Sequence, residues 1–341
     1  MTLTPELLRR LPKAELHVHL DGSLRPETMI ELAREQHVTL PSTDPARLRD
    51  AMLVRNARTL EEYLERYFIT VAVMQTPGAL ERIAYEFVVD VAKENVRYVE
   101  VRYCPALHTP ALTLAQAVEA PLAGIRRAEK ETGTRVGLII CALRTLPSST
   151  SEDLARLAVD YKGSGVVAFD LAGSEQGHPA RDHAKAFRHA AAHGLACTCH
   201  AGEGDGPDSI RQAIEECGAS RIGHGTRLGQ DERVLDYVLD HHVPLEMCLT
   251  SNVHTGTVPD VRHHPARTYF DRGCVVTLNT DGRLMDGIDL TGEYWRAHTE
   301  LGFSRAEIDR LILNTFESAF LPEPEKREMV ARIERELKAI Q

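Results

Sequence analysis

Two histidines in the segment Glu15-Leu16-His17-Val18-His19-Leu20-Asp21 are separated by a single residue within an apolar run. In a β-strand, alternate side chains point to the same face, so His17 and His19 would lie side by side. Two imidazoles placed in this way can bind one metal ion, although such a pair can equally be exposed or lie in a core. A metal site therefore requires further ligands elsewhere in the chain.

Candidates for the other ligands are His200 and Asp281, each of which comes at or just after the end of a short apolar run. With His17 and His19 they would supply three neutral nitrogens and one carboxylate, a set that zinc accepts. No lysine that could bridge two metals ends the run 166–172, which favours one ion rather than two. We therefore expect these four residues to bind a single metal ion.

Chemistry beside a metal needs a general acid or base, and Glu203 lies three residues after His200 in the sequence His-Ala-Gly-Glu. Partial burial would keep the Glu203 carboxyl group protonated, so that it can donate a proton to a heteroatom of a substrate. His224 is a candidate for orienting or deprotonating a water whose pKa the metal lowers to roughly 7. The alternative is that Glu203 is only a solvated loop carboxylate.

Other catalytic motifs are absent from the sequence or incomplete. Segment 202–206 is rich in glycine, but it lacks the lysine and the Ser/Thr of a phosphate-binding loop and the spacing of a dinucleotide site. No Gly-x-Ser-x-Gly sequence is present to form a nucleophile elbow. Cys197 and Cys199 precede His200, but a zinc-thiolate site there would lack the Cys-x-x-Cys pair that usually completes it.

Eight short apolar runs position these residues. Runs that are apolar at nearly every position are typical of parallel strands covered by helices. Eight strand-helix units make a closed (β/α)8 barrel, in which catalytic residues lie at the carboxyl ends of the strands. We therefore predict an α/β protein with a (β/α)8 TIM barrel, in preference to an open doubly wound sheet, because polar residues end so many of the runs. The runs are residues 14–20, 97–104, 136–143, 166–172, 196–200, 221–224, 244–249 and 275–279.

The stretch 21–96 predicts a helical insertion after the first strand, with helices to about residue 35 and from about 44 to 95. It contains a stripe of apolar residues at helical spacing, which either packs into the core or forms a lid over the site. No Pro-, Gly- or Ser-rich linker divides the chain, so we expect residues 1–341 to form a single domain. The stripe consists of Leu60, Tyr63, Leu64 and Tyr67.

Composition limits the possible partners. The chain has 40 basic and 50 acidic residues and a net charge of −10, which argues against nucleic acid and anionic membranes and favours a small substrate. No apolar run is long enough to span a bilayer, and the N-terminus lacks a secretory pattern, so we expect a soluble cytoplasmic protein. Seven cysteines without regular spacing predict buried free thiols rather than disulfides.

The chain resembles the adenosine deaminase family of the metal-dependent amidohydrolase superfamily. The matching motifs occur in order over nearly the whole length, and Phe320-Leu321-Pro322 resembles the closing segment of that family. The motifs are Pro12-Lys13-Ala14-Glu15-Leu16-His17-Val18-His19-Leu20-Asp21-Gly22, Tyr98-Val99-Glu100-Val101-Arg102-Tyr103, Asp170-Leu171-Ala172-Gly173, His200-Ala201-Gly202-Glu203, Arg221-Ile222-Gly223-His224-Gly225 and Leu278-Asn279-Thr280-Asp281.

The resemblance implies a zinc-dependent deaminase. One Zn²⁺ per chain would be bound by His17, His19, His200 and Asp281, and zinc-bound hydroxide would attack C6 of adenosine or 2′-deoxyadenosine, giving ammonia and an inosine-type product. Glu203 would protonate N1, and His224 would position the water. The other implied roles are a sugar contact from Asp21, an N3 contact from the backbone amide of Gly173 and a cover made by the stripe that begins at Leu60. We also expect Asp170 and Ser251 to support the metal ligands.

One position departs from the family pattern. The family usually has a second aspartate directly after the metal ligand, contacting purine N7, whereas this chain reads Asp281-Gly282-Arg283. The N7 contact would then be absent, made by water or supplied by another residue, such as Asp286 or Asp289. Three interpretations follow: a slower adenosine deaminase, a deaminase for another 6-aminopurine compound such as adenine or aminodeoxyfutalosine, or a nucleoside-binding protein of low activity. If the contact is merely missing, Gly282→Asp is expected to raise adenosine turnover.

Overall fold

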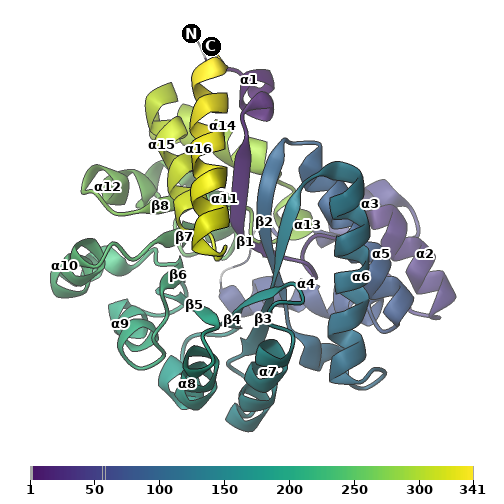
Figure 1. Ribbon diagram of the computed structural model, residues 1–341. Coiled ribbons are helices and arrows are strands. Elements are labelled where there is room, and N and C mark those ends of the chain that lie inside the picture. The colour runs from purple at the N-terminus through teal and green to yellow at the C-terminus, as the bar shows by residue number, and fades with distance from the viewer. Residues whose placement is uncertain (1–2, 56, 58, 341) are drawn as a thin grey trace.

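Eight parallel strands form a barrel in which each strand pairs with the next one along the chain (Figure 1). The computed structural model describes residues 3–55, 57 and 59–340. The predicted (β/α)8 architecture is thus confirmed. The strands are β1 (Lys13–His19), β2 (Val96–Tyr103), β3 (Arg135–Leu143), β4 (Val166–Ala172), β5 (Ala196–Ala201), β6 (Arg221–His224), β7 (Leu245–Met247) and β8 (Val276–Leu278).

The barrel closes between β1 and β8 through the residues that follow β8. The backbone N–H of Asp281 donates to the His17 carbonyl at 3.0 Å, and the His19 N–H donates to the Asp281 carbonyl at 2.8 Å. The side-chain oxygen of Asn279 accepts from the backbone of Leu16 and His17, at 2.8 and 3.1 Å. Closure itself therefore brings the His-x-His pair of the first strand beside Asp281 from the other end of the chain.

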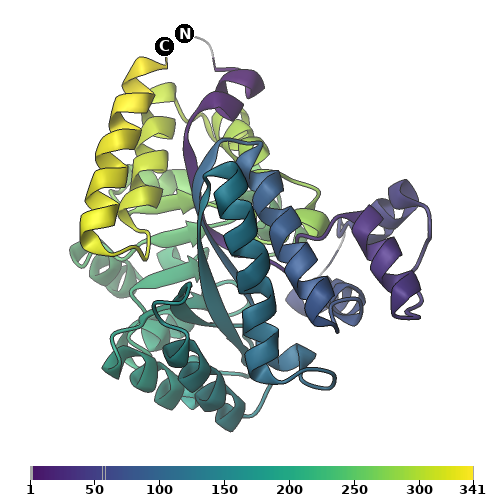
Figure 2. The same cartoon turned by 45° about the vertical axis from the view of Figure 1, so that its right-hand side comes forward.

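Helices surround the barrel, and those between β1 and β2 project from one side of it (Figures 1 and 2). These inserted helices are α2 (Pro26–Glu35), α3 (Pro45–Met52), α4 (Leu60–Ala72) and α5 (Pro77–Ala92), preceded in the chain by α1 (Pro5–Arg10). The remaining helices are α6 (Leu114–Thr132), α7 (Ser148–Asp160), α8 (Ala184–Ala192), α9 (Pro207–Glu215), α10 (Glu232–Asp240), α11 (Leu249–His254), α12 (Ala266–Asp271), α13 (Arg283–Asp286), α14 (Leu290–Leu301), α15 (Arg305–Glu317) and α16 (Glu323–Ala339), with short 3-10 helices η1 (Pro105–His108), η2 (Ala180–His183), η3 (Leu228–Gln230) and η4 (Val261–His263).

Local sequence explains where the inserted helices begin. Proline is the first residue of α2, α3 and α5, where its missing N–H costs nothing and its fixed φ suits the helix. The side chains of Asp44, Thr59 and Thr76 cap α3, α4 and α5 by accepting a backbone N–H of the first turn. The start of α4 at Leu60 sets which residues of that helix turn toward the barrel.

The barrel interior holds a buried ionic network that the apolar character of the strands does not indicate. Arg102 on β2 contacts Asp170 and Glu246, each at 2.9 Å. Arg221 on β6 contacts Glu246 at 2.6 Å and Glu100 at 2.5 Å. A buried charged side chain requires such partners, because its desolvation without them would cost roughly several kcal/mol. The network lies directly behind two of the candidate metal ligands.

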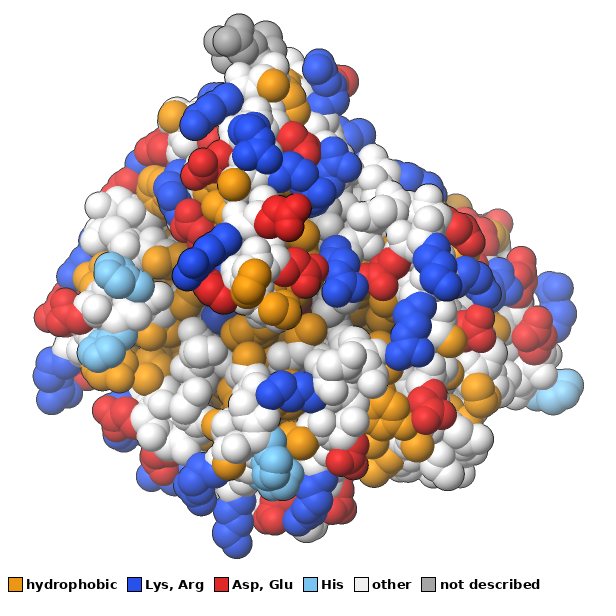
Figure 3. Space-filling model, viewed as in Figure 1, with side chains coloured by type: hydrophobic (Ala, Val, Ile, Leu, Met, Phe, Trp, Pro, Cys, Tyr) orange, Lys and Arg blue, Asp and Glu red, His pale blue; other side chains and the backbone are white. Residues whose placement is uncertain are grey.

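Charged groups of both signs are interspersed on the face shown in Figure 3. None of the helices in the described ranges is long and apolar enough to cross a membrane. All seven cysteines are buried and free, which confirms the prediction of free thiols.

Candidate active site

Four ligand-type side chains meet at the carboxyl ends of β1, β5 and β8. The Nε2 atoms of His19 and His200 lie 3.1 Å apart. Asp281 Oδ1 lies 3.3 Å from Nε2 of His17 and 3.3 Å from Nε2 of His19. One ligand atom from each of the four residues lies within 4.8 Å of all the others. The structure thus brings together the set predicted to bind a metal.

The chemistry of this cluster fits a zinc ion. His17 Nε2 is buried, and its 3.3 Å contact with Asp281 Oδ1 lacks the geometry of a hydrogen bond. Burial lowers the pKa of His19 and of His200, so both present neutral nitrogens. Against the effect of burial, the contact with His17 holds the pKa of Asp281 well below its usual range, so Asp281 presents a carboxylate. Three imidazole nitrogens and one carboxylate aimed at one point are a donor set that Zn²⁺ accepts.

The other ring nitrogen of His17 and of His200, and the other carboxylate oxygen of Asp281, are held from behind. His17 Nδ1 lies 2.8 Å from Glu246, and His200 Nδ1 lies 3.2 Å from Asp170. The Ser251 hydroxyl donates to Asp281 Oδ2 at 2.6 Å. These contacts decide which nitrogen or oxygen faces the cluster. Asp170 and Ser251 thus contact His200 and Asp281, two of the residues predicted to bind the metal.

Glu246 and Arg102 are supporting residues that the sequence did not single out. Arg102 joins Asp170 to Glu246, so one cation holds the carboxylates behind two different histidines. The Arg102 and Glu246 side chains are fully buried. A signal was present in the sequence, since Glu246 is the single charged residue of the run 244–249 and Arg102 lies between apolar or aromatic neighbours in the run 97–104.

Glu203 and His224 lie together beside the cluster, with His224 Nε2 3.4 Å from a Glu203 oxygen. The Asn252 side chain links them, at 3.3 Å from Glu203 and 3.1 Å from His224 Nδ1. Burial, reinforced by the charges of Asp281 and Glu175, raises the pKa of Glu203 well above its ordinary value. Burial also lowers the pKa of His224 far below 6.5. The pair therefore consists of a protonated carboxyl group and a neutral imidazole.

The backbone at this site is held in an unusual conformation. His224 and Asp281 have φ values of 62° and 60°, in the left-handed region that non-glycine residues seldom occupy. Such strain persists only where the surrounding structure imposes it, and it is concentrated at functional sites. Both residues are anchored by barrel hydrogen bonds that run through their neighbours.

Glu175 anchors the loop that carries Glu203. Its carboxylate accepts backbone N–H groups from Gly202 at 2.6 Å, Glu203 at 3.0 Å, Gly204 at 2.6 Å and Asp205 at 3.0 Å. Four successive N–H groups turned toward one point form an anion-binding nest. The glycine-rich sequence 202–206 was a signal for such a turn, but nothing local indicates which carboxylate fills it.

A cavity of about 410 Å³ opens in front of the cluster. Asp21 lines it, and its Oδ1 is buried without a hydrogen-bond partner among the described residues. Burial raises the pKa of Asp21 to about 7. Gly173 lies in the cavity wall with φ of 95°. Of the described residues that line the cavity, none is a lysine or arginine.

Helix α4 forms one wall of this cavity with the predicted stripe. Leu60, Tyr63, Leu64 and Tyr67 all line it, and Phe68 stands at its edge with 75% of its surface exposed. Tyr63 is also buried in the hydrophobic core. Both interpretations of the stripe are thus partly realised, because the same residues pack on the barrel and face the cavity.

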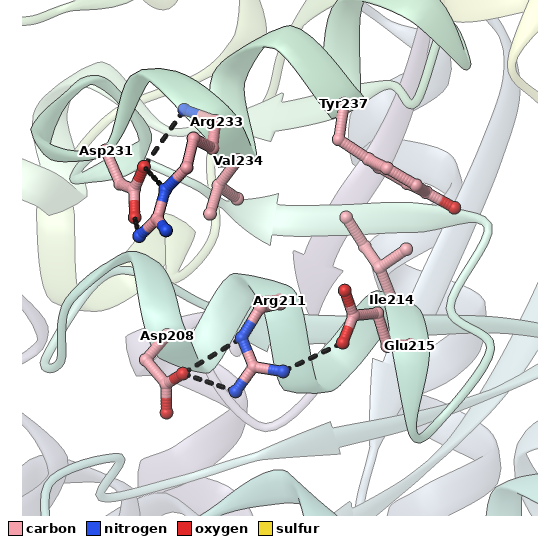
Figure 4. Close-up of a pocket in the computed structure, with 8 residues that line it drawn as sticks. All are labelled: Asp208, Arg211, Ile214, Glu215, Asp231, Arg233, Val234 and Tyr237. Carbon is pink, nitrogen blue, oxygen red and sulfur yellow. Dashed lines mark hydrogen bonds and ion pairs between the residues drawn. The ribbon is translucent and has the colours of Figure 1, made fainter.

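Two other groupings are poor candidates for a metal or substrate site. Cys248 lies near His17 and His224, but burial raises the pKa of its thiol well above 9. Cys197 and Cys199 belong to no metal-ligand cluster among the described residues. A surface cleft between α9 and α10 is lined by Arg211, paired with Asp208 and Glu215, and by Arg233, paired with Asp231 (Figure 4). Its charges are neutralised within the cleft.

The chain is similar in sequence to adenosine deaminases of other organisms. A probable adenosine deaminase of Dictyostelium discoideum is 39% identical over 328 residues, which are 95% of this chain and 42% of that protein, so the chain spans less than half the length of this relative. An adenosine deaminase of Clostridium acetobutylicum is 38% identical over 331 residues, covering 96% of this chain and 99% of that protein.

Solved structures share the fold over the same length. An adenine deaminase from Arthrobacter aurescens has a TM-score of 0.88 at 26% identity, covering 96% of this chain and 99% of that one. The N6-mAMP deaminase of Arabidopsis has a TM-score of 0.86 at 26% identity, covering 97% and 99%. A family model described as adenosine deaminase matches residues 12–336. The chain therefore belongs to the adenosine deaminase family and is a hydrolase that acts on carbon-nitrogen bonds.

Proposed function

We propose that the protein deaminates adenosine and 2′-deoxyadenosine, producing inosine or 2′-deoxyinosine and ammonia, with one Zn²⁺ held by His17, His19, His200 and Asp281. The observation that carries this proposal is the pairing of Glu203 with His224 beside the ligand cluster, at 3.4 Å. A protonated acid and a neutral base next to a metal site are the groups that a hydrolytic deamination needs. They face the cavity together.

The proposed roles follow from the protonation states. When bound, the metal supplies Lewis-acid activation of water at neutral pH. Glu203, with its raised pKa, donates its proton to ring nitrogen N1, which makes the neighbouring C6 more electrophilic. His224, with its lowered pKa, accepts a proton from the attacking water. Asn252 keeps the two groups aligned. The proton that His224 accepted passes to the amino group, which leaves C6 as ammonia, and the hydroxyl proton at C6 returns to Glu203.

The cavity supports a nucleoside as the substrate. The unpartnered Oδ1 of Asp21 would accept a sugar hydroxyl, and free adenine would leave it buried and unsatisfied. AMP would bring a dianion into a cavity that contains the carboxylates of Glu61 and Asp281 but no described lysine or arginine. The backbone amide of Gly173 would contact N3, and α4 would close over the base as the lid part of a single domain.

A second candidate is a nucleoside with a larger aromatic group on its 5′ carbon, such as aminodeoxyfutalosine. Phe68, 75% exposed at the cavity edge, favours it because a large exposed aromatic side chain at a pocket mouth can stack on an aromatic ring. The catalytic roles of Glu203 and His224 would be the same for this substrate.

Ammonia release from the zinc-loaded chain tests the proposal. The panel is adenosine, 2′-deoxyadenosine, adenine, AMP and aminodeoxyfutalosine, with metal content measured on the same samples. We expect adenosine and 2′-deoxyadenosine to be turned over. Adenine, which lacks the sugar that contacts Asp21, and AMP, which adds a charged phosphate, should each be at least about 100-fold poorer in kcat/KM. No turnover of any compound with zinc bound would refute the deaminase proposal, and saturable adenosine binding in that case would identify a nucleoside-binding protein.

A further inference from the structure

Two tyrosine hydroxyls occupy the space next to Gly282, the residue that follows Asp281. A Cβ atom added at Gly282 would lie 2.5 Å from the Tyr63 hydroxyl oxygen and 2.8 Å from that of Tyr67. The backbone does not require glycine, because φ of Gly282 is −107°. Space therefore accounts for the glycine, since no Cβ fits while both hydroxyls are in place.

The Tyr63 hydroxyl is fixed by residues of α13 and α11. It donates to Asp286 Oδ2 at 2.9 Å, and Asp286 Oδ1 lies 2.8 Å from His254 Nδ1. Asp286, one of the two aspartates suggested from the sequence, thus reaches this corner of the site through a tyrosine. Asp289 does not, because it caps α14 and pairs with Arg9.

Tyr67 retains a proton for a ligand. A tyrosine hydroxyl carries one proton, and Tyr63 donates its proton to Asp286. The Tyr67 ring lies beside that of Tyr63, at 6.1 Å between centroids, and rotation about the Cζ–O bond of Tyr67 can turn its own proton toward an acceptor in the cavity. No heavy atom needs to move for this change.

Tyr67 and Glu203 lie on different flanks of the ligand cluster. The Tyr67 ring packs edge-on against His19 at 6.0 Å between centroids, whereas Glu203 contacts His224. The rings of His19 and His224 each contact those of His17 and His200, but among the described ring pairs they do not contact each other. A purine with N1 at Glu203 and C6 at the cluster presents N7, on the other side of C6, toward the flank of Tyr67.

We propose that the Tyr67 hydroxyl, positioned by Tyr63 and Asp286, donates a hydrogen bond to purine N7, and that Gly282 leaves room for this pair of hydroxyls. This inference rests on the proposed function, because it assumes a 6-aminopurine nucleoside with N1 at Glu203. It replaces the expectation that Gly282→Asp raises turnover. An aspartate at this position would displace both hydroxyls and lower turnover.

The first experiment compares adenosine with 7-deazaadenosine, in which a C–H group replaces N7. For wild type we expect kcat/KM to be at least about 10-fold higher for adenosine, since a donor without its acceptor is costly. Tyr67→Phe should lower kcat/KM for adenosine about 10-fold or more and change that for 7-deazaadenosine little, so the ratio falls toward one. Tyr161→Phe, at the C-cap of α7 and outside the cavity, is the matched control and should keep the wild-type ratio. A Tyr67→Phe enzyme with an unchanged ratio would overturn the inference.

The second experiment tests the packing of Gly282 against the hydroxyls. Gly282→Ala should lower kcat/KM for adenosine in the wild-type background. In the Tyr63→Phe/Tyr67→Phe background the atoms that collide with the new Cβ are gone, so the same substitution should change kcat/KM less than about twofold. Equal losses in the two backgrounds would contradict the proposed packing.

Binding measurements separate this inference from the proposed function. Adenosine turnover by the wild-type, zinc-loaded protein tests the function without reference to Tyr67. If no turnover is found, calorimetric Kd values for adenosine and 7-deazaadenosine provide the same ratio for wild type and Tyr67→Phe. Preference for adenosine that disappears in Tyr67→Phe supports the N7 contact, and equal ratios refute it, whatever the outcome of the activity assay.

Discussion

Glu175→Gln should damage the site without touching any ligand or substrate atom. The substitution keeps the shape of the side chain but replaces a carboxylate that accepts four backbone N–H groups with a neutral amide. The best orientation of the amide places its oxygen where Oε2 lies, which retains the bonds from Glu203, Gly204 and Asp205. The amide nitrogen then faces the Gly202 N–H, a donor against a donor.

The magnitude follows from these bonds. Three charge-assisted bonds become neutral ones, at about 1 kcal/mol each, and one buried donor loses its acceptor, at about 1 to 3 kcal/mol. Relaxation of the loop recovers part of this, so we expect a loss of about 2 to 4 kcal/mol in the free energy of unfolding. Because Glu203 lies in the same loop, a displacement of about 1 Å should lower kcat roughly 10- to 100-fold.

The assay combines urea unfolding with steady-state ammonia release from adenosine, on samples of equal zinc content. Glu232→Gln, an exposed carboxylate paired with Arg272, is the matched control and should leave both measurements unchanged. Glu175→Asp keeps the charge but shortens the reach, and should recover stability better than kcat. The reasoning fails if Glu175→Gln unfolds and turns over adenosine like wild type.

Four further predictions concern the acid, the metal, the buried network and pH. Glu203→Gln should retain zinc, measured by elemental analysis, and lose nearly all deaminase activity, because an amide has no acidic proton for N1; near-wild-type activity would remove Glu203 from the proposed role. Chelation should abolish activity and lower Tm, and added zinc should restore both, whereas full activity of the metal-free protein would contradict the proposed site. Arg102→Met leaves Asp170 and Glu246 buried without their shared cation and should lower the free energy of unfolding by about 3 to 5 kcal/mol. A loss below about 1 kcal/mol in urea titrations would mean that the network does not stabilise the fold. Burial lowers the pKa of His264 to about 3. The neutral form of His264 therefore contributes stability that is complete above pH 6.5 and is lost as pH falls toward 3, with a loss of about 2 kcal/mol in the free energy of unfolding at pH 5. Urea titrations of wild type and His264→Gln at pH 7 and 5 should show this part of the pH dependence only in wild type.

Much of the fold and of the candidate site follows from local sequence. The alternation of apolar runs with helical stretches predicts the barrel, because strand and helix periodicity are local properties. In that fold, residues at the strand ends meet at one mouth, so His17, His200 and Asp281 can be placed together without a structure. The proposed chemistry then depends on residue types, which the sequence states directly.

The supporting contacts require tertiary structure. Glu246 meets His17 across 229 positions of sequence, and Glu175 meets the amides of the Glu203 loop across 27 to 30 positions. Each is a charged residue in a region where a charge has several possible partners. The partner of Glu246 depends on the inward-facing side of β7 and on the closure of the barrel, which brings β1 from the other end of the chain. The partner of Glu175 depends on how the loops after β4 and β5 pack on each other.

Gly282 shows which conclusions come from the sequence alone and which require the tertiary structure. By itself the sequence determined that a side chain is absent directly after Asp281, and therefore that a contact expected from that position is either missing or made by another group. Only the tertiary structure decided what fills the space: two hydroxyls from α4, one of them bonded to Asp286, which lies 223 residues further along the chain. The physical reason is that residue type is a local property, whereas the volume around a residue is set by whatever the fold packs against it.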